Sequence, residues 1–292
     1  MKISIDNTSP LITSEDTSVA LCESLKKRGH DVKLHIGNEP FYTRIKTFPC
    51  DYYFTDGMII DKDMIHFLSN NYIKTLFIIN IPSQMQKEQV ISLEKFLLEN
   101  KVNYKFIQDS NFSQSSMSIL KKKENLVNTC YGYTGYLLGA KDRKWDRKIN
   151  TLFICNGQNT EPEDFFKIAE QGETFHILRT RNPYCQIGLE NMRKRIEDYK
   201  DILCNYNSFC FWKLKEAPMG RMLYEICRLN KPVYVYEPSD IKYVHRALKT
   251  TEDLSWANRG NVNFDTIYKT VETEFTFEKQ IDKLLSHLPK IK

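Results

Sequence analysis

A stretch near the C-terminal end, "EAPMGRMLYEICRLNKPVYVYE" (residues 216–237), combines a glycine, an arginine and a glutamate in a spacing suited to nucleotide binding. Gly220 precedes a predicted helix, so a ligand can approach its backbone closely and meet the free N–H groups of the first turn. Arg221 can bind a phosphate through its fork of donors, and Glu225, one turn later on the same face, can accept both hydroxyls of a ribose. The alternative is a surface ion pair between Arg221 and Glu225, worth about 0.3 kcal/mol.

Several other motifs that carry chemistry are missing from the sequence. No segment matches GxGxxG, GxxxxGK[ST], GxSxG or HExxH, so the chain is not an obvious dinucleotide-binding or P-loop protein. The six histidines show no ligand spacing, and the eight cysteines contain no CxxC pair. We therefore expect no bound metal and no resident cofactor, and we interpret the cysteines as reduced, buried thiols.

The composition indicates a globular protein. Of 292 residues, 41% are hydrophobic and 27% are charged, which is enough for a packed core. No stretch approaches the roughly 18 to 20 apolar residues that span a bilayer, and the first residues carry no apolar signal-peptide region. We expect a soluble, cytoplasmic monomer with no membrane span, in a host cytoplasm if a phage encodes it. The net charge of +5 permits an anionic partner, either a nucleotide diphosphate or a nucleic acid.

Apolar strands and amphipathic helices alternate along the chain, which predicts an α/β fold with parallel sheets. Strands are predicted at residues 1–7, 30–36, 51–57, 73–82, 103–110, 149–157, 173–180, 201–212 and 232–237. Helices are predicted at residues 17–29, 62–71, 88–101, 114–126, 161–172, 189–200 and after Gly220, with one or two more over 266–288. The pattern restarts after a Gly- and Tyr-rich stretch, so we place a domain boundary near residue 147.

The 216–237 segment resembles the donor-binding segment of glycosyltransferases with the GT-B fold. The resemblance implies that Glu225 binds the ribose of a nucleotide-sugar and that Gly220 and Arg221 face its diphosphate. It also implies two doubly wound Rossmann-like domains that face a cleft, with a C-terminal helix that returns to the first domain. Residues 1–147 would then bind the acceptor, and residues 148–292 would bind the nucleotide-sugar.

A second segment, "FICNGQNTEPEDFFKIAEQGETFHILRTRNPY", resembles the first β-α-β unit of such a donor domain and implies that Gly157 and Arg179 lie beside the donor. In element order, the whole chain is similar to phage DNA glucosyltransferases, which share "TSED" at the first helix and "PFYTRIKTF" after the second strand. Those enzymes transfer glucose from UDP-glucose to hydroxymethylcytosine in duplex DNA. The resemblance implies a UDP-sugar donor and a hydroxymethylated base in double-stranded DNA as acceptor.

The sequence departs from these families at two places. Glu216 and Glu225 have eight residues between them where the common pattern has seven, which leaves Glu225 as the safer choice. The catalytic aspartate of the phage enzymes would fall near Asn80, and an asparagine cannot serve as a base.

Another carboxylate must then remove the acceptor proton if the transfer inverts the sugar. Candidates in the strand-to-helix loops of the first half are Asp16, Asp109 and Asp56, ranked in that order. Asp16 and its neighbour Glu15 could instead be capping or first-turn acids, and Asp56 in "TDG" could be a turn former.

Two rival functions stay open. The 216–237 segment also resembles nucleoside deoxyribosyltransferases, in which the glutamate is the nucleophile, although the extra α/β domain upstream argues against them. A non-catalytic module that binds a nucleotide or a nucleic acid is the other alternative. "YGYTGY" and "KKKENL" could contact nucleic acid or form a solvated surface and linker, and Arg44 could contact DNA phosphate or be an ordinary surface arginine.

Overall fold

The computed structural model describes residues 1–7, 12–36, 40–56, 60, 66, 74–81, 85–108, 119–128, 151–156, 175–180, 206–212, 220–236 and 250–289. The chain forms two compact units. Unit 1 consists mainly of Met1–Tyr131 and Glu278–Lys292, and unit 2 mainly of Gly132–Asn182 and Arg193–Phe277. The predicted domain boundary near residue 147 lies outside the described residues and stays a prediction.

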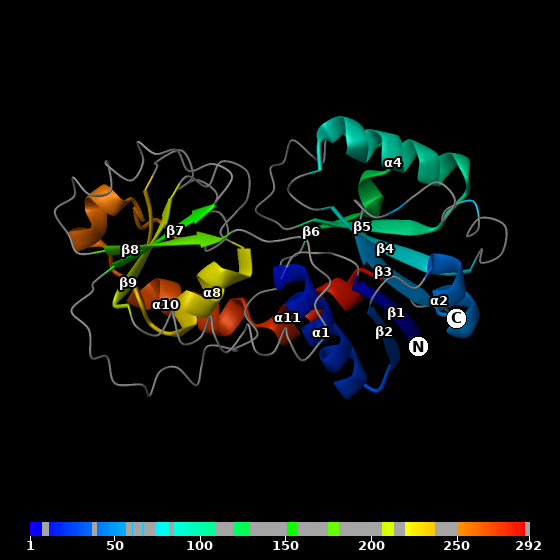
Figure 1. Cartoon of the computed structure of the whole chain (residues 1–292), viewed down its shortest axis with the longest axis horizontal. Helices are drawn as coiled ribbons and strands as arrows, with labels where there is room; N and C mark the ends of the chain where they lie inside the picture. The colour runs from blue at the N-terminus through cyan, green and yellow to red at the C-terminus, as the bar shows by residue number, and fades with distance from the viewer. Residues whose placement is uncertain are drawn as a thin grey trace. The chain divides into compact units, whose positions relative to one another are not determined.

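Unit 1 contains a sheet with strand order β2-β1-β3-β4-β5-β6 among the described residues (Figure 1). Each neighbouring pair of strands is parallel. The strands are β1 (Lys2–Asn7), β2 (Asp31–Ile36), β3 (Tyr52–Asp56), β4 (Leu76–Asn80), β5 (Tyr104–Gln108) and β6 (Leu126–Asn128). The predicted α/β class with a Rossmann-like parallel sheet is therefore confirmed.

Helices cover both faces of this sheet, α4 on one side and α1 with α11 on the other (Figure 1). The helical elements of unit 1 are α1 (Ile12–Lys27), α2 (Phe41–Thr47), α4 (Lys87–Glu99), the 3-10 turn η1 (Lys123–Asn125) and α11 (Phe277–Ser286). Polar contacts hold α11 to α1. The Ser24 hydroxyl donates to the Glu278 carboxylate at 2.8 Å, and Arg28 donates to Asp282 at 2.7 Å.

The core of unit 1 lies between the sheet and helices α2 and α4. The register places Tyr53 beside Phe77 and Phe77 beside Tyr104, so three rings line up across β3, β4 and β5. The Tyr53 and Phe77 rings lie 5.7 Å apart. Helix α4 packs on this row because its apolar residues recur at helical spacing. They are Val90, Leu93 and Leu97.

One carboxylate is buried inside this core. Glu94 of α4 is 1% exposed and accepts three hydrogen bonds. They come from the Tyr104 hydroxyl at 3.1 Å, the Lys121 backbone N–H at 2.7 Å and the Lys122 backbone N–H at 2.9 Å. Glu94 therefore fixes the segment before η1 to helix α4, because each of these donors would lose its partner without it.

Unit 2 contains a smaller parallel sheet with order β10-β9-β7-β8 among the described residues. Its strands are β7 (Thr151–Asn156), β8 (Phe175–Thr180), β9 (Ser208–Trp212) and β10 (Val233–Val235). Its helical elements are α8 (Gly220–Arg228), the 3-10 segment η3 (Trp256–Asn261) and α10 (Asp265–Glu274). Helix α8 packs on α10, where the rings of Tyr224 and Phe275 stack at 4.7 Å.

Each predicted strand is present where the structure describes it, but helix α2, strand β6 and the 3-10 segment η3 were not predicted. Helix α2 and strand β6 have only seven and three residues, too few for a clear periodic pattern. The helix predicted over residues 114–126 is wrong in its described part, where only the single turn η1 forms before β6. The helices predicted at 161–172 and 189–200, and all of 62–71 except His66, lie outside the described residues.

Replacing Glu94 tests the role of this buried carboxylate. We expect Glu94→Ala to lower the free energy of unfolding by about 3 kcal/mol, since it leaves the buried Tyr104 hydroxyl and two partly buried backbone N–H groups without an acceptor. Urea denaturation of the protein, followed by tyrosine fluorescence, measures the change. The matched control is Glu99→Ala on the same helix, where the exposed pair with Lys95 at 3.8 Å is worth only a few tenths of a kcal/mol. Equal losses in both variants would contradict the anchoring role.

Candidate functional site

The sheet of unit 2 reverses its strand order at β7. The chain passes from β7 to β8 on one side and then returns to β9 on the other. In open α/β sheets, ligands bind beyond the carboxyl ends of the strands at such a reversal. The carboxyl ends of β7 and β9, here named the unit 2 switch point, are therefore the place where this unit is built to hold a ligand.

The backbone brings the predicted donor-binding segments to this edge. Gly157 lies outside the described residues but directly follows β7, which ends at Asn156. Arg179 is the next-to-last residue of β8 and pairs in register with Cys155 of β7. Cys155 also pairs with Trp212, the last residue of β9. The ends of all three strands thus lie at one level of the sheet.

Helix α8 completes this edge. It begins at Gly220, eight residues after β9 ends, and leads to β10, which runs parallel to β9. Because the helix connects parallel strands, its amino terminus lies at the carboxyl edge of the sheet. Its first N–H groups have no intrahelical acceptor and favour an anion there. Gly220 and Arg221 occupy the first two positions, as the sequence predicts for residues that face a diphosphate.

Glu225 lies in the second turn of α8 and is completely buried, at 0% exposed. The residue takes part in an interaction within the protein. The alternative of a surface ion pair with Arg221 is therefore wrong, because such a pair needs an exposed carboxylate. This burial was not predicted, since a glutamate on a short helix is usually exposed.

The sheet of unit 1 reverses at β1 in the same way. The chain passes from β1 to β2 on one side and then from β2 to β3 on the other side of β1. The carboxyl ends of β1 and β3, at Asn7 and Asp56, form the unit 1 switch point. Asp56 pairs in register with Asn80, the last residue of β4. A carboxylate residue therefore stands one strand away from the asparagine that replaces the expected aspartate.

The other two predicted bases take different places. Asp16 is the fifth residue of α1, which begins at Ile12, so it lies beyond the first turn and the capping alternative is wrong for it. Asp109 lies outside the described residues, directly after β5. Strand β4 separates β5 from β3, so the end of β5 lies further from the switch point than the end of β3.

A buried ion pair lies beneath the unit 1 switch point. Arg44 of α2 is paired with Asp6 of β1, and their side chains are 4% and 5% exposed. The Thr55 hydroxyl of β3 donates to the second carboxylate oxygen of Asp6 at 3.4 Å. Both earlier alternatives for Arg44, a DNA phosphate contact or an ordinary surface arginine, are therefore wrong. The pair instead joins β1, β3 and α2 close to the carboxyl ends of β1 and β3.

Neutral polar groups extend this cluster. Nε2 of His35 lies 3.4 Å from the Ser4 hydroxyl, and the His35 ring stacks beside that of Tyr53. Burial, with the nearby charges of Arg44 and Lys33, lowers the pKa of His35 to about 4. Burial also raises the pKa of Tyr53. Both side chains are therefore uncharged at neutral pH, and neither can exchange a proton easily.

The described cysteines are free thiols, as interpreted from the sequence. Burial raises the pKa of Cys50 to about 11 and that of Cys227 to about 12. Neither sulfur therefore offers a thiolate nucleophile at neutral pH. Among the described residues, no three His, Cys, Asp or Glu side chains are grouped to hold a metal ion. No helix in the described part of the chain is long and apolar enough to cross a bilayer.

No known protein-family pattern matches the sequence, and no curated protein matches it. Two solved structures of ABC transporter solute-binding proteins are similar at low level. One, from Mycobacterium smegmatis with bound glycerol, has 12% identity over 79% of this chain and 71% of that chain, with a TM-score of 0.27. The other, from R. palustris in complex with 4-hydroxybenzoate, has 10% identity over 100% of this chain and 85% of that chain, with a TM-score of 0.26. Similarity at this level carries no argument about function.

The buried His35 predicts a loss of stability in acid. The unfolded chain binds a proton at His35 near pH 6.5, whereas the folded chain does not until about pH 4. Stability therefore falls as the pH drops through this window, by about 2 kcal/mol between pH 7.5 and pH 5. Urea denaturation at both pH values measures it. His35→Gln should flatten this dependence, while His287→Gln, at an exposed position directly after α11, should leave it unchanged. Equal pH dependence in wild type and His35→Gln would contradict the assignment.

Proposed function

We propose that the chain is a glycosyltransferase that moves a sugar from a nucleotide-sugar, with a UDP-sugar as the first candidate, to a hydroxyl acceptor. The observation that carries the proposal is the unit 2 switch point. The end of β7, Arg179 on β8 and the amino terminus of α8 meet at one edge of one sheet. That edge supplies free N–H groups and the backbone positions of two arginines, which is the chemistry a diphosphate requires.

The chemistry of transfer divides between the two units in this proposal. The acceptor oxygen loses its proton to a base at the unit 1 switch point and attacks the anomeric carbon. The bond from that carbon to the diphosphate breaks, and the charge that develops on the leaving group is stabilised by the start of α8 and by Arg221. The GT-B arrangement, in which two such edges face one cleft, belongs to the proposal. So does a hydroxymethylated base of double-stranded DNA as the acceptor to test first.

Asp56 is the base that the backbone supports best. It ends β3 at the point where the strand order of unit 1 reverses, and it pairs in register with Asn80. The ion pair of Asp6 with Arg44 holds β1 against α2 beneath this point. A rigid base of this kind raises the rate because its oxygen keeps its position as the acceptor arrives.

The donor site is tested first by binding. Thermal shift against UDP-, GDP-, ADP-, CMP- and dTDP-sugars identifies the donor, since a ligand at about 100 times its dissociation constant adds about 2.7 kcal/mol. We expect Glu225→Ala to weaken the binding of that donor at least about 10-fold, because in this proposal the buried carboxylate exchanges its present interaction for a charged hydrogen bond to the ribose. Glu272→Ala is the control in unit 2, where it removes only an exposed partner of Arg228.

Two outcomes would contradict the donor assignment. If Glu225→Ala lowered the melting temperature but left the dissociation constant unchanged, the buried carboxylate would be purely structural. If free deoxynucleosides stabilised the protein and no nucleotide-sugar did, the deoxyribosyltransferase alternative would replace the proposal.

The base is tested by turnover with the identified donor and hydroxymethylated duplex DNA. We expect Asp56→Asn to lower kcat by about 100-fold or more, because a general base contributes on the order of 10² to 10⁴ in rate. Asp16→Asn and Asp109→Asn should each change kcat only a few-fold. Transfer of radiolabelled sugar to DNA measures all three. A large loss confined to Asp16→Asn or to Asp109→Asn would move the base to that residue.

A further inference from the structure

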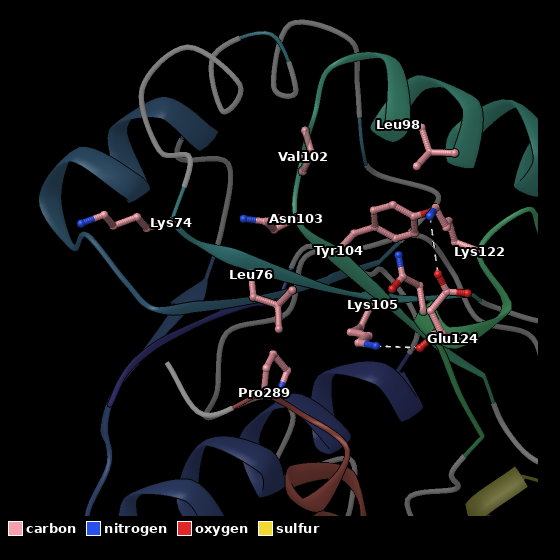
Figure 2. A pocket seen from close by; sticks show the side chains of 11 residues that line it. Lys74, Leu76, Leu98, Val102, Asn103, Tyr104, Lys105, Lys122, Glu124 and Pro289 are labelled. Carbon is pink, nitrogen blue, oxygen red and sulfur yellow. Dashed lines mark hydrogen bonds and ion pairs between the residues drawn. The ribbon is translucent and has the colours of Figure 1, made fainter. Parts of the chain in front are cut away.

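A groove of about 460 Å³ lies at the amino edge of the unit 1 sheet, opposite the edge that carries Asp56 (Figure 2). Its floor is apolar. Leu76 at the start of β4 faces Pro289 after α11, and Leu98 at the end of α4 lies on the other side of the sheet edge (Figure 2). Tyr104, which starts β5, is 3% exposed beneath them. We name this feature the lysine groove after the residues on its walls.

Three lysines line the walls, namely Lys74, Lys105 and Lys122. Three more lie in the same chain segments, namely Lys101, Lys121 and Lys123, and all three are exposed. Against these six lysines stand two carboxylates, that of Glu94 buried beneath Lys121 and Lys122 and, at the groove itself, that of Glu124. It lies 3.7 Å from the Lys122 ammonium. The edge is therefore strongly positive although the whole chain carries only +5.

The backbone under these lysines is fixed. Glu94 holds the N–H groups of Lys121 and Lys122 from inside the core. The Lys105 ammonium donates to the Glu124 carbonyl oxygen at 2.6 Å, which ties β5 to η1 (Figure 2). A run of lysines in a solvated linker would need no buried carboxylate to hold its main chain. The arrangement therefore presents positive charge from an ordered surface, at low entropic cost for a ligand.

We propose that the lysine groove binds the phosphate backbone of a nucleic-acid strand. Lysines alone, with no arginine on the walls, suit phosphate contacts that do not depend on sequence. The lysines lie beside β4, β5 and β6, whose spacing of about 4.8 Å spreads the charge over roughly 10 Å, more than one phosphate occupies. This binding does not require sugar transfer and is separate from the proposed donor site.

Other macromolecules fit the groove less well. The large apolar side chains exposed in the described part of the chain are Met1, Tyr42 and Ile91, none of which lines it, so it lacks the apolar anchor that a membrane surface would need. A protein partner would be expected to meet aromatic residues and arginine, because lysine is depleted from protein interfaces.

Fluorescence anisotropy with a labelled 20-nucleotide strand of mixed sequence, and its duplex, tests the proposal in the absence of nucleotide-sugar. We expect binding that weakens between about 50 and 200 mM salt. The triple variant Lys74→Gln, Lys122→Gln, Lys123→Gln should lose at least 10-fold in affinity and lower the slope against log salt by about 2 to 3. The anchoring bonds to Glu94 involve backbone N–H groups, so the variant keeps them.

The control is the triple variant Lys27→Gln, Lys87→Gln, Lys269→Gln, which removes the same charge from exposed positions on α1, α4 and α10. It should bind within about twofold of wild type. Equal losses of affinity in both triple variants would overturn the proposal in favour of a general charge effect. A lack of binding by the wild-type protein would also overturn it. Competition by tripolyphosphate as effective as that by the unlabelled 20-nucleotide strand would assign the groove to a small polyphosphate instead. Matching melting temperatures of the variants confirm that both are folded.

Discussion

Parallel pairing of strands is the constraint on which the rest of this structure depends. In a parallel sheet all carboxyl ends gather at one edge and all amino ends at the other, and each crossover helix begins at the carboxyl edge. Arg179 and Gly220 are far apart in sequence. They reach one edge because β8, which carries Arg179, and β9, which precedes α8, both pair in register with β7. The same constraint separates Asp56 from the lysine groove, because Asp56 lies level with the end of β4, whereas the groove lies where β4 and β5 begin.

Buried charge in unit 1 serves the edges of the sheet and not its centre. Glu94 is placed where a loop enters the amino edge, and Asp6 with Arg44 lies where β1 leaves the carboxyl edge. Taking a charge out of water costs several kcal/mol unless every group finds a partner, so such residues define the geometry around them more strictly than an apolar side chain would. The Glu94 cluster joins an irregular segment to helix α4, and the Asp6 cluster joins strands β1 and β3 to helix α2.

Strands were predictable from the sequence because runs such as "LFIIN" are apolar throughout, as a strand buried on both faces must be. The long helix α4 was predictable from the spacing of its apolar residues. A helix was wrongly predicted over residues 114–126 because "MSILKKKENL" has a helical composition. The hydrogen bonds from the backbone of Lys121 and Lys122 to Glu94 override that preference. The position of the unit 2 switch point followed from motif and element order, but the burial of Glu225 and of Arg44 did not, because their surroundings come from distant parts of the chain.

The two edges of unit 1 bear on the choice of acceptor. Strand β4 has five residues and so separates the lysine groove from the carboxyl edge by about 16 Å. Successive nucleotides of a strand in a duplex rise about 3.4 Å, so some five of them cover that distance. A free nucleoside or a small glycosyl acceptor cannot contact both edges at once, whereas a nucleic acid can be held at the groove while one of its bases is presented at the opposite edge. Positive charge at the groove would then add affinity without taking part in the chemistry. Only a polymeric acceptor is long enough to gain affinity at the groove while it reacts at the carboxyl edge.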